Sequence, residues 1–226
     1  THDLERSRGI TIFSKQARLE TAARSVTLVD TPGHVDFSAE AERILPILDC
    51  AVLVISGTDG VQAHTVTLWK LLERYHVPTF LFINKMDLPV RLQREILAEL
   101  QSQLSGGCID FNGDPDEIAE SCAMCDEALL ETYLETGEVT DGNIRGLIKA
   151  RKVFPCCFGS ALKLQGVEEL LEALDLYAPQ PEYPADFAAR VYKITRDPQG
   201  NRLTWLKVTG GILKVRSLIS YVNQKG

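Results

Sequence analysis

The sequence predicts an α/β domain with a mainly parallel sheet flanked by helices, followed by part of a β-barrel. Short runs of apolar residues, typical of strands buried on both faces, alternate with segments of helical periodicity. After a proline-rich stretch at residues 179–185, the pattern changes to alternating strands separated by turns. The 226-residue chain is therefore expected to contain a sheet domain at 1–178, a linker at 179–185 and a partial β module at 186–226.

The first part of the chain predicts a β-hairpin. Residues 11–20 have the composition of a strand, and residues 25–30 form a second, more apolar strand. This second strand must end at Thr31-Pro32-Gly33, because proline cannot continue a ladder of hydrogen bonds. A helical pattern follows over residues 37–48.

The next segments repeat the order of strand and helix. Apolar runs at residues 50–56 and 78–84 predict buried strands, and residues 61–75 and 91–104 have helical spacing. In parallel sheets covered by helices, ligands bind at the carboxyl ends of the strands. The residues that follow each strand are therefore the first candidates for a site.

The charge of the chain is unevenly distributed. The 24 Lys and Arg residues face 31 Asp and Glu residues, for a net charge of −7, which argues against a generally basic nucleic-acid binder. Between Arg94 and Arg145 there are thirteen acidic residues and no basic one. We expect an acidic helical insertion over about residues 108–150, exposed to solvent.

The remaining elements complete the sheet domain and begin the β module. Residues 153–158 predict one more strand, and residues 166–177 predict a helix with an apolar face. After the linker, strands are expected at residues 187–195, 203–209 and 215–222.

Composition also restricts the surroundings of the protein. No apolar run approaches the roughly 18 residues of a membrane span, so we expect a soluble protein without a membrane partner. The six cysteines follow no signal peptide, which predicts reduced thiols and a cytoplasmic location. Cys122 and Cys125 form a single CxxC without a second pair or a nearby histidine, so a metal or redox site is disfavoured.

The first strand end of interest is Asp30-Thr31-Pro32-Gly33-His34. A carboxylate at a strand end can hold Mg²⁺ through its waters, and a glycine lets a backbone N–H approach a phosphate oxygen. Taken alone, the same residues are also compatible with a simple turn.

The second strand end is Asn84-Lys85-Met86-Asp87. The Asp87 carboxylate can accept two hydrogen bonds from N1–H and the exocyclic amine of guanine, a pair of donors that adenine lacks. A solvated helix start is the alternative interpretation.

The third strand end is Gly159-Ser160-Ala161-Leu162. Its small residues can present backbone N–H groups to the guanine carbonyl. Alone this signal is weak, but three such signatures in this order, each closing an apolar strand, are difficult to explain as turns and caps.

With these motifs, the sequence resembles the translational GTPases, especially elongation factor G and the tetracycline-resistance ribosomal protection proteins. The resemblance extends from Arg-Gly-Ile-Thr in residues 4–12 to the β module at 187–222. It implies a P-loop-NTPase-like G domain followed by the start of the family's second domain. It also implies GTP and GDP as ligands, Mg²⁺ as cofactor, and the ribosome, its rRNA and its proteins, as partner.

The resemblance assigns roles to individual residues. Thr11 would coordinate Mg²⁺ and sense the terminal phosphate, Asp30 would hold Mg²⁺ through water, and His34 would position the attacking water as the catalytic residue. The nucleotide would also be bound by Thr31, Pro32, Gly33, Asn84, Lys85, Asp87, Ser160, Ala161 and Leu162.

The family's phosphate loop, G-x-x-x-x-G-K-[ST], occurs nowhere in the 226 residues. Because this loop supplies most of the phosphate contacts, we expect these residues alone to bind nucleotide poorly and to hydrolyse it hardly at all. The strand that leads into the loop is central in the family's sheet. We expect an upstream segment to supply both, the alternatives being that neighbouring strands close the gap or that another chain fills it.

The leading hypothesis is a ribosome-stimulated GTPase. Translocation, ribosomal protection from tetracycline and release-factor recycling are not separated by these residues. The alternative is a nucleotide-independent binding module derived from a GTPase fold. A biosynthetic enzyme on a related fold is disfavoured, because the sequence contains no further nucleophile or acid-base constellation. No DNA partner is expected, and a monomer is favoured although the sequence leaves the oligomeric state open.

Overall fold

The computed structural model describes residues 15–21, 23–31 and 42–219. Contacts along the chain divide it into two compact units, Thr1–Gln180 and Pro181–Gly226. The break between them falls inside the proline-rich stretch at residues 179–185.

The first unit is built on a four-stranded sheet in which all neighbouring strands are parallel. Its strands, in spatial order, are β3 (Ala51–Ser56), β4 (Thr79–Asn84), β6 (Phe154–Phe158) and β5 (Cys108–Asp110). The inner strands have buried side chains on both faces, as their apolar runs require. The predicted fold class, a parallel sheet flanked by helices, is confirmed.

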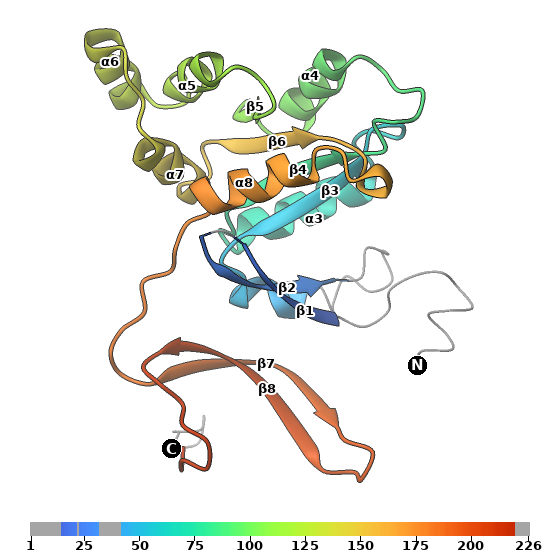
Figure 1. Ribbon diagram of the computed structural model, residues 1–226, viewed down its shortest axis with the longest axis vertical. Coiled ribbons are helices and arrows are strands. Elements are labelled where there is room, and N and C mark those ends of the chain that lie inside the picture. Colours follow the sequence, from blue (N-terminus) through green and yellow to red (C-terminus); the bar gives the residue numbers. More distant parts are fainter. Residues whose placement is uncertain (1–14, 22, 32–41, 220–226) are drawn as a thin grey trace. The chain divides into compact units, whose positions relative to one another are not determined.

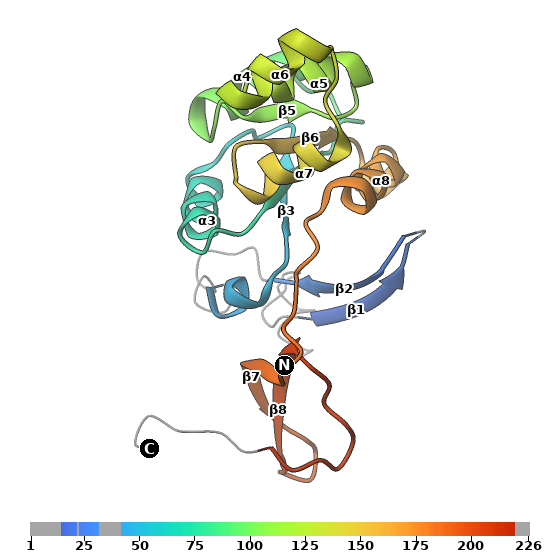
Figure 2. The same cartoon turned by 90° about the vertical axis from the view of Figure 1, so that its left-hand side faces the viewer.

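Helices cover both faces of this sheet (Figures 1 and 2). One face packs against α3 (Ala63–Arg74) and α4 (Gln93–Gln103), with Leu81 and Ile83 of β4 in the core between them. Phe80 and Phe82 point to the opposite face and pack in a second core. The helices on that side are α5 (Pro115–Ala123), α6 (Glu127–Thr136), α7 (Asp141–Lys149) and α8 (Val167–Tyr177).

The acidic insertion forms helices because its polar residues cap them. The side chains of Asp114, Asp126 and Thr140 each accept a hydrogen bond from a backbone N–H in the first turn of α5, α6 and α7. Gly137 ends α6 in the left-handed conformation, with φ 72°. The predicted acidic helices are therefore present, but the short strand β5 precedes them and was not predicted.

The expected hairpin is also present. Strands β1 (Lys15–Glu20) and β2 (Ser25–Asp30) pair antiparallel. Near the turn, Thr21 Oγ1 donates to Asp175 Oδ1 of α8 at 2.6 Å, and Arg24 donates to the carbonyl of Ala178 at 3.1 Å. The hairpin remains a separate sheet, and no described residue of β2 pairs with β3.

The second unit begins with a hairpin of β7 (Ala188–Arg196) and β8 (Arg202–Gly210). Its turn closes because Asp197 Oδ1 accepts the N–H of Asn201 at 2.7 Å and Gly200 adopts a φ of 86°. The prediction of a strand over residues 215–222 is wrong for residues 215–219, the part that the structure describes. Residues 215 and 216 form a turn instead, closed by the Ser217 N–H bonding to the Lys214 carbonyl at 3.2 Å, and residues 217–219 have no regular secondary structure.

Within the described part of the chain, no helix has the length and apolar character required to cross a membrane.

Candidate functional site

Three neighbouring strands of the parallel sheet, β3, β4 and β6, end side by side. Ser56 at the end of β3 pairs in register with Asn84 at the end of β4. Ile83 of β4 likewise pairs with Phe158, the last residue of β6. The polar segments that follow these strands are therefore brought to one edge of the sheet.

Asn84 connects two of these segments. Its Oδ1 atom accepts the backbone N–H of Lys85 at 2.8 Å and that of Ala161 at 2.9 Å. Lys85 has a φ of 67°, a conformation that costs free energy for a non-glycine residue and is maintained by its surroundings. The Met86 N–H then donates to the Gly159 carbonyl at 3.0 Å. Two loops that are far apart in the sequence are thus joined by hydrogen bonds.

Asp87 lies where the loops after β4 and β6 meet. The hydroxyl of Ser160, and then the charge and ammonium group of Lys163, hold the pKa of the Asp87 carboxyl below its usual range. Lys163 Nζ is 3.5 Å from Asp87 Oδ2, and the Asp87 side chain retains 11% of its exposure. The group is therefore an ionised carboxylate at neutral pH, and it can act only as a hydrogen-bond acceptor.

The loop after β6 is fixed by its own backbone. Ser160 and Gln165 exchange two hydrogen bonds, of 2.9 and 3.0 Å, around the short turn η3 (Ala161–Lys163). Ser160 is buried, whereas Leu162 is 89% exposed. The loop therefore presents Ala161 and Leu162 outward while Ser160 anchors it.

Two glycines that were not predicted as site residues are required for this packing. A Cβ atom on Gly159 would lie 2.1 Å from the Gln165 carbonyl oxygen, a clash with backbone. On Gly57, directly after β3, it would lie 2.8 Å from Met86 Sδ and 3.2 Å from the Asn84 carbonyl oxygen. Both glycines come directly after an apolar strand. A glycine at this position is the sequence signal from which they could have been predicted to belong to the site.

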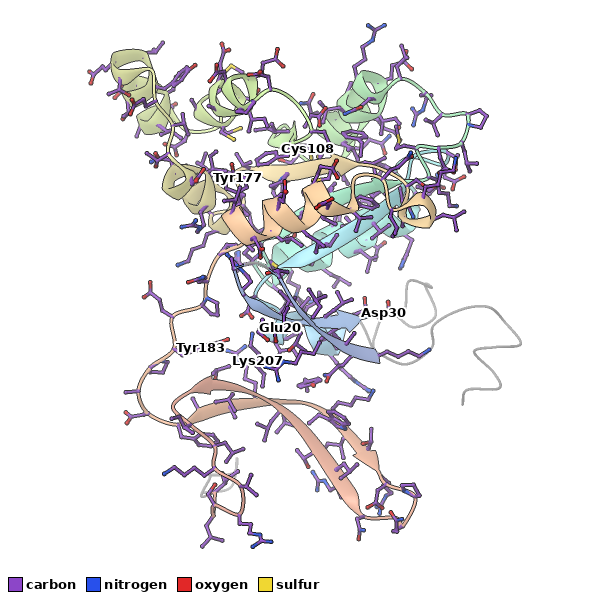
Figure 3. All side chains as sticks on the ribbon, in the orientation of Figure 1. Glu20, Asp30, Cys108, Tyr177, Tyr183 and Lys207 are labelled. Atoms are coloured by element: carbon purple, nitrogen blue, oxygen red, sulfur yellow. The ribbon has the colours of Figure 1, made fainter. Side chains whose placement is uncertain are left out.

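The predicted phosphate side is only partly described. Asp30 ends β2 (Figure 3), and Thr31 follows it. Thr11, Pro32, Gly33 and His34 lie outside the described residues. A carboxylate at a strand end is an oxygen donor of the kind that Mg²⁺ prefers, so the chemistry of Asp30 is compatible with its expected role, which stays a prediction.

The structure places the predicted residues Asn84, Lys85, Asp87, Ser160, Ala161 and Leu162 together in two adjacent loops. Asp30 and Thr31 belong to the separate hairpin. The contact of Lys163 with Asp87 adds a residue that sequence reasoning left out, and the bond between Gly159 and Met86 joins two residues that belonged to the predicted signatures without an assigned role.

The cysteines form no disulfide, and Cys122 lies buried in α5. Burial, with a smaller contribution from Cys125, raises the pKa of the Cys122 thiol to about 12. It is therefore a neutral, packed thiol at physiological pH. No cluster of three or more His, Cys, Asp or Glu side chains suited to a metal ion occurs among the residues that the structure places.

Asn84 gives a first testable prediction. In Asn84→Ala the N–H groups of Lys85 and Ala161 lose their acceptor. We therefore expect the free energy of unfolding to fall by about 1–3 kcal/mol. Urea unfolding followed by tryptophan fluorescence measures this change. Asn84→Asp keeps the acceptor oxygen and is the matched control, with an expected cost below about 1 kcal/mol. Equal losses in the two variants would show that the Oδ1 contacts are not the cause.

Comparison with known proteins identifies relatives of the chain. A protein-family model described as "Elongation factor Tu GTP binding domain" matches residues 1–180. Elongation factor G 1 of Geobacter sulfurreducens is 30% identical over an alignment of 281 positions, which covers 93% of this chain and 41% of the relative. Elongation factor G 1 of Treponema pallidum is 34% identical over 228 positions, covering 79% of this chain and 33% of the relative.

The same fold occurs in a crystal structure of a protein from Thermus thermophilus. Its TM-score is 0.81 at 24% sequence identity, and the match covers 92% of this chain and 38% of that chain. At this identity the match establishes the fold alone. The chain spans about two fifths or less of the length of each of these three proteins.

Proposed function

Because the chain belongs to the translational GTPases of the elongation factor G family, we propose that it binds the guanine base of GTP and GDP with the loops after β4 and β6. The contacts of Asp87 carry this proposal. An ionised carboxylate held by Ser160 and Lys163 at the end of a parallel strand is a fixed acceptor for two neighbouring N–H donors.

Each residue of the two loops contributes a different part of the recognition. Asp87 accepts the N1–H and the exocyclic amine of guanine, and adenine is rejected because it has no such pair of donors. Asn84 keeps the loop of Ala161 in place by accepting the Ala161 N–H, and the exposed turn η3 would present the Leu162 N–H to the guanine carbonyl. Lys85 turns the chain after β4 through its left-handed conformation.

The phosphate side of the proposal depends on Thr11, Asp30, Thr31, Pro32, Gly33 and His34. Asp30 and Thr11 would hold Mg²⁺, which neutralises phosphate charge when bound. Gly33 would offer its N–H to the terminal phosphate, and His34 would orient the attacking water.

We further propose that the main phosphate contacts come from outside residues 1–226. The sequence contains no G-x-x-x-x-G-K-[ST] motif. Consistently, β3 pairs only with β4 and β2 only with β1 among the described strands, so the ladder groups on one side of each have no strand partner there. A strand placed between β2 and β3 would satisfy them and would carry a phosphate loop to the edge where Asn84 lies. There are two alternatives to such a strand: β2 and β3 pair directly with each other, or another chain supplies the strand between them.

The proposed activity of the whole protein is hydrolysis of GTP to GDP and phosphate, which drives a conformational switch on the ribosome in the cytoplasm. rRNA and ribosomal proteins are the proposed partners. The two elongation factor G relatives favour translocation over protection from tetracycline.

A nucleotide-independent binding module is the second candidate. The absence of the phosphate-loop motif from these residues favours it. The hydrogen bond of Asn84 with Ala161 and the position of Asp87 beside Ser160 and Lys163 weigh against it, because a scaffold does not require a fixed carboxylate at this position.

Calorimetric titration with GTP, GDP and ATP in the presence of Mg²⁺ tests the proposal. The full-length protein should bind GTP and GDP but not ATP. Residues 1–226 alone should bind at least about a hundredfold more weakly, because each missing contact to a charged group contributes about 1.5–3 kcal/mol. If the full-length protein bound neither guanine nucleotide, the scaffold candidate would replace the GTPase proposal.

A further inference from the structure

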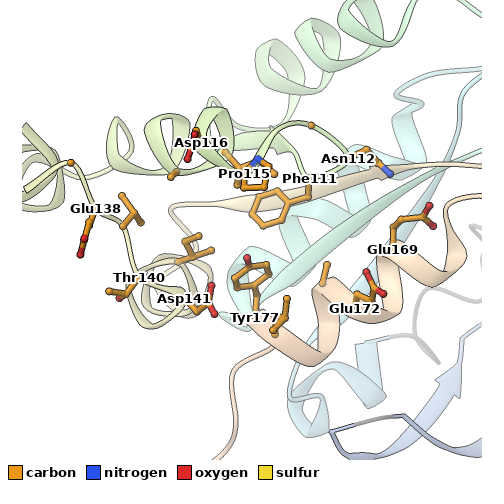
Figure 4. Close-up of a pocket in the computed structure, with 18 residues that line it drawn as sticks. Phe111, Asn112, Pro115, Asp116, Glu138, Thr140, Asp141, Glu169, Glu172 and Tyr177 are labelled. Atoms are coloured by element: carbon orange, nitrogen blue, oxygen red, sulfur yellow. The ribbon is translucent and has the colours of Figure 1, made fainter.

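The first unit contains a pocket that the guanine site does not use. Its volume is about 690 Å³, within the range of small-ligand and side-chain binding pockets. It lies between the end of β5, α5, the segment before α7, and α8 (Figure 4). None of the residues predicted to contact nucleotide lines it.

The interior of the pocket is aromatic and apolar. The rings of Phe111 and Tyr177 lie edge to face, with centroids 5.5 Å apart and planes at 85°. Ile144 and Ala173 are buried beside them. Such a surface can accept the hydrocarbon part of a side chain or the flat face of a guanidinium group.

The charged side chains that line the pocket are all acidic, and a neighbouring cation, the Arg145 guanidinium, is turned to the carbonyl of Leu176 at 2.7 Å. No Lys, Arg or His lines it, and five acidic residues do: Asp116, Glu138, Asp141, Glu169 and Glu172. Within the described part of the chain, the ion pairs found involve none of these five carboxylates. Like charges collected around an apolar hollow repel one another, and a bound cation would relieve this repulsion.

One of these carboxylates lies close to the aromatic pair. Burial, followed by the negative charge of Asp141, raises the pKa of the Tyr177 hydroxyl. Tyr177 is therefore neutral at physiological pH, and its ring and Asp141 line the same pocket. A group that is both flat and cationic matches this surface best.

We propose that this pocket binds a basic peptide segment of a protein partner, with an arginine side chain between the Phe111–Tyr177 pair and the acidic rim. Arginine combines a planar face for aromatic contacts with donors arranged for carboxylates. Nucleic acid does not fit, because its phosphates would meet five carboxylates. A peptide side chain also contacts the apolar interior of the pocket, whereas a simple metal cation would interact with the carboxylates alone.

A labelled synthetic peptide tests this inference. The probe is a short fluorescein-labelled peptide in which arginine alternates with leucine and alanine, and its binding is measured by fluorescence anisotropy at low and at physiological salt. A peptide with glutamate in place of arginine is the matched control. The full-length protein should bind the arginine peptide and not the glutamate peptide.

Variants separate the pocket from general charge attraction. Glu138→Gln/Glu169→Gln/Glu172→Gln removes three exposed rim charges and should weaken arginine-peptide binding about tenfold, since each exposed pair contributes modestly. Glu120→Gln/Glu131→Gln/Glu135→Gln removes three equally exposed charges from α5 and α6 outside the pocket. This second triple variant should change binding less than about twofold.

Phe111→Leu keeps an apolar floor and removes the aromatic contact, so it should weaken binding severalfold while leaving the salt dependence unchanged. Equal weakening by the two triple variants, or no binding of the peptide by the wild-type protein, would overturn the inference. GTP binding should be the same in both triple variants, so this result is independent of the GTPase proposal.

Discussion

Replacing Asp87 with asparagine should lower the affinity of the full-length protein for GTP and GDP by about a hundredfold, because two charge-assisted hydrogen bonds to guanine lose the charged acceptor. Asp87 is the carboxylate that Ser160 and Lys163 hold where the loops after β4 and β6 meet. Calorimetric titration with GDP measures the change.

The matched control for this variant is Asp59→Asn. Asp59 is an exposed carboxylate in the loop after β3, and Lys85 helps to lower its pKa after the larger contribution of the Ser56 hydroxyl. Its neutralisation alters local charge without removing the proposed guanine acceptor, so we expect less than about a threefold effect. Similar losses in both variants would show that charge in general, and not the acceptor at Asp87, determines nucleotide affinity.

Replacing Phe80 with alanine should destabilise the first unit by about 3–5 kcal/mol, the usual cost of removing a buried phenyl ring from a core. Phe80 has no exposed surface in the centre of β4, and its ring packs into the core beneath α5 to α8. The same strand ends at Asn84, so loss of this packing should also reduce the temperature range over which nucleotide binds.

Urea unfolding followed by tryptophan fluorescence measures the Phe80 effect. The chain has two tryptophans, one in each unit, so the experiment is best done in a Trp205→Phe background in which buried Trp69 reports on the first unit alone. Phe80→Leu retains most of the apolar volume and should cost about 1–1.5 kcal/mol. A loss below about 1.5 kcal/mol in Phe80→Ala would show that the core refills the space.

Much of the first unit could be predicted because its signals are local. Apolar runs without alternation gave β3, β4 and β6, and helical spacing gave α3, α4 and α8. β5 was missed, since Cys108–Asp110 is too short to show a period. β6 contains Pro155, which a strand tolerates here because it lies next to the start of the strand.

The second unit shows how composition can mislead. The segment from Val215 onward is rich in the β-branched and apolar residues typical of a strand, yet residues 215 and 216 form a turn and Val215 is 93% exposed. Strand pairing depends on a neighbouring strand, and no such neighbour for these residues occurs in the described part of the chain.

By itself the sequence determined the type of most long elements, the order of the polar signatures after the strands, and the residues that we propose select guanine. These properties depend on side-chain chemistry and on spacing within a few residues. Only the tertiary structure decided the contacts between distant segments: Asn84 with Ala161, Asp87 with Lys163, and Asp141 with Tyr177. Strand register and helix packing set those distances, and neither is encoded in any single short segment of the chain.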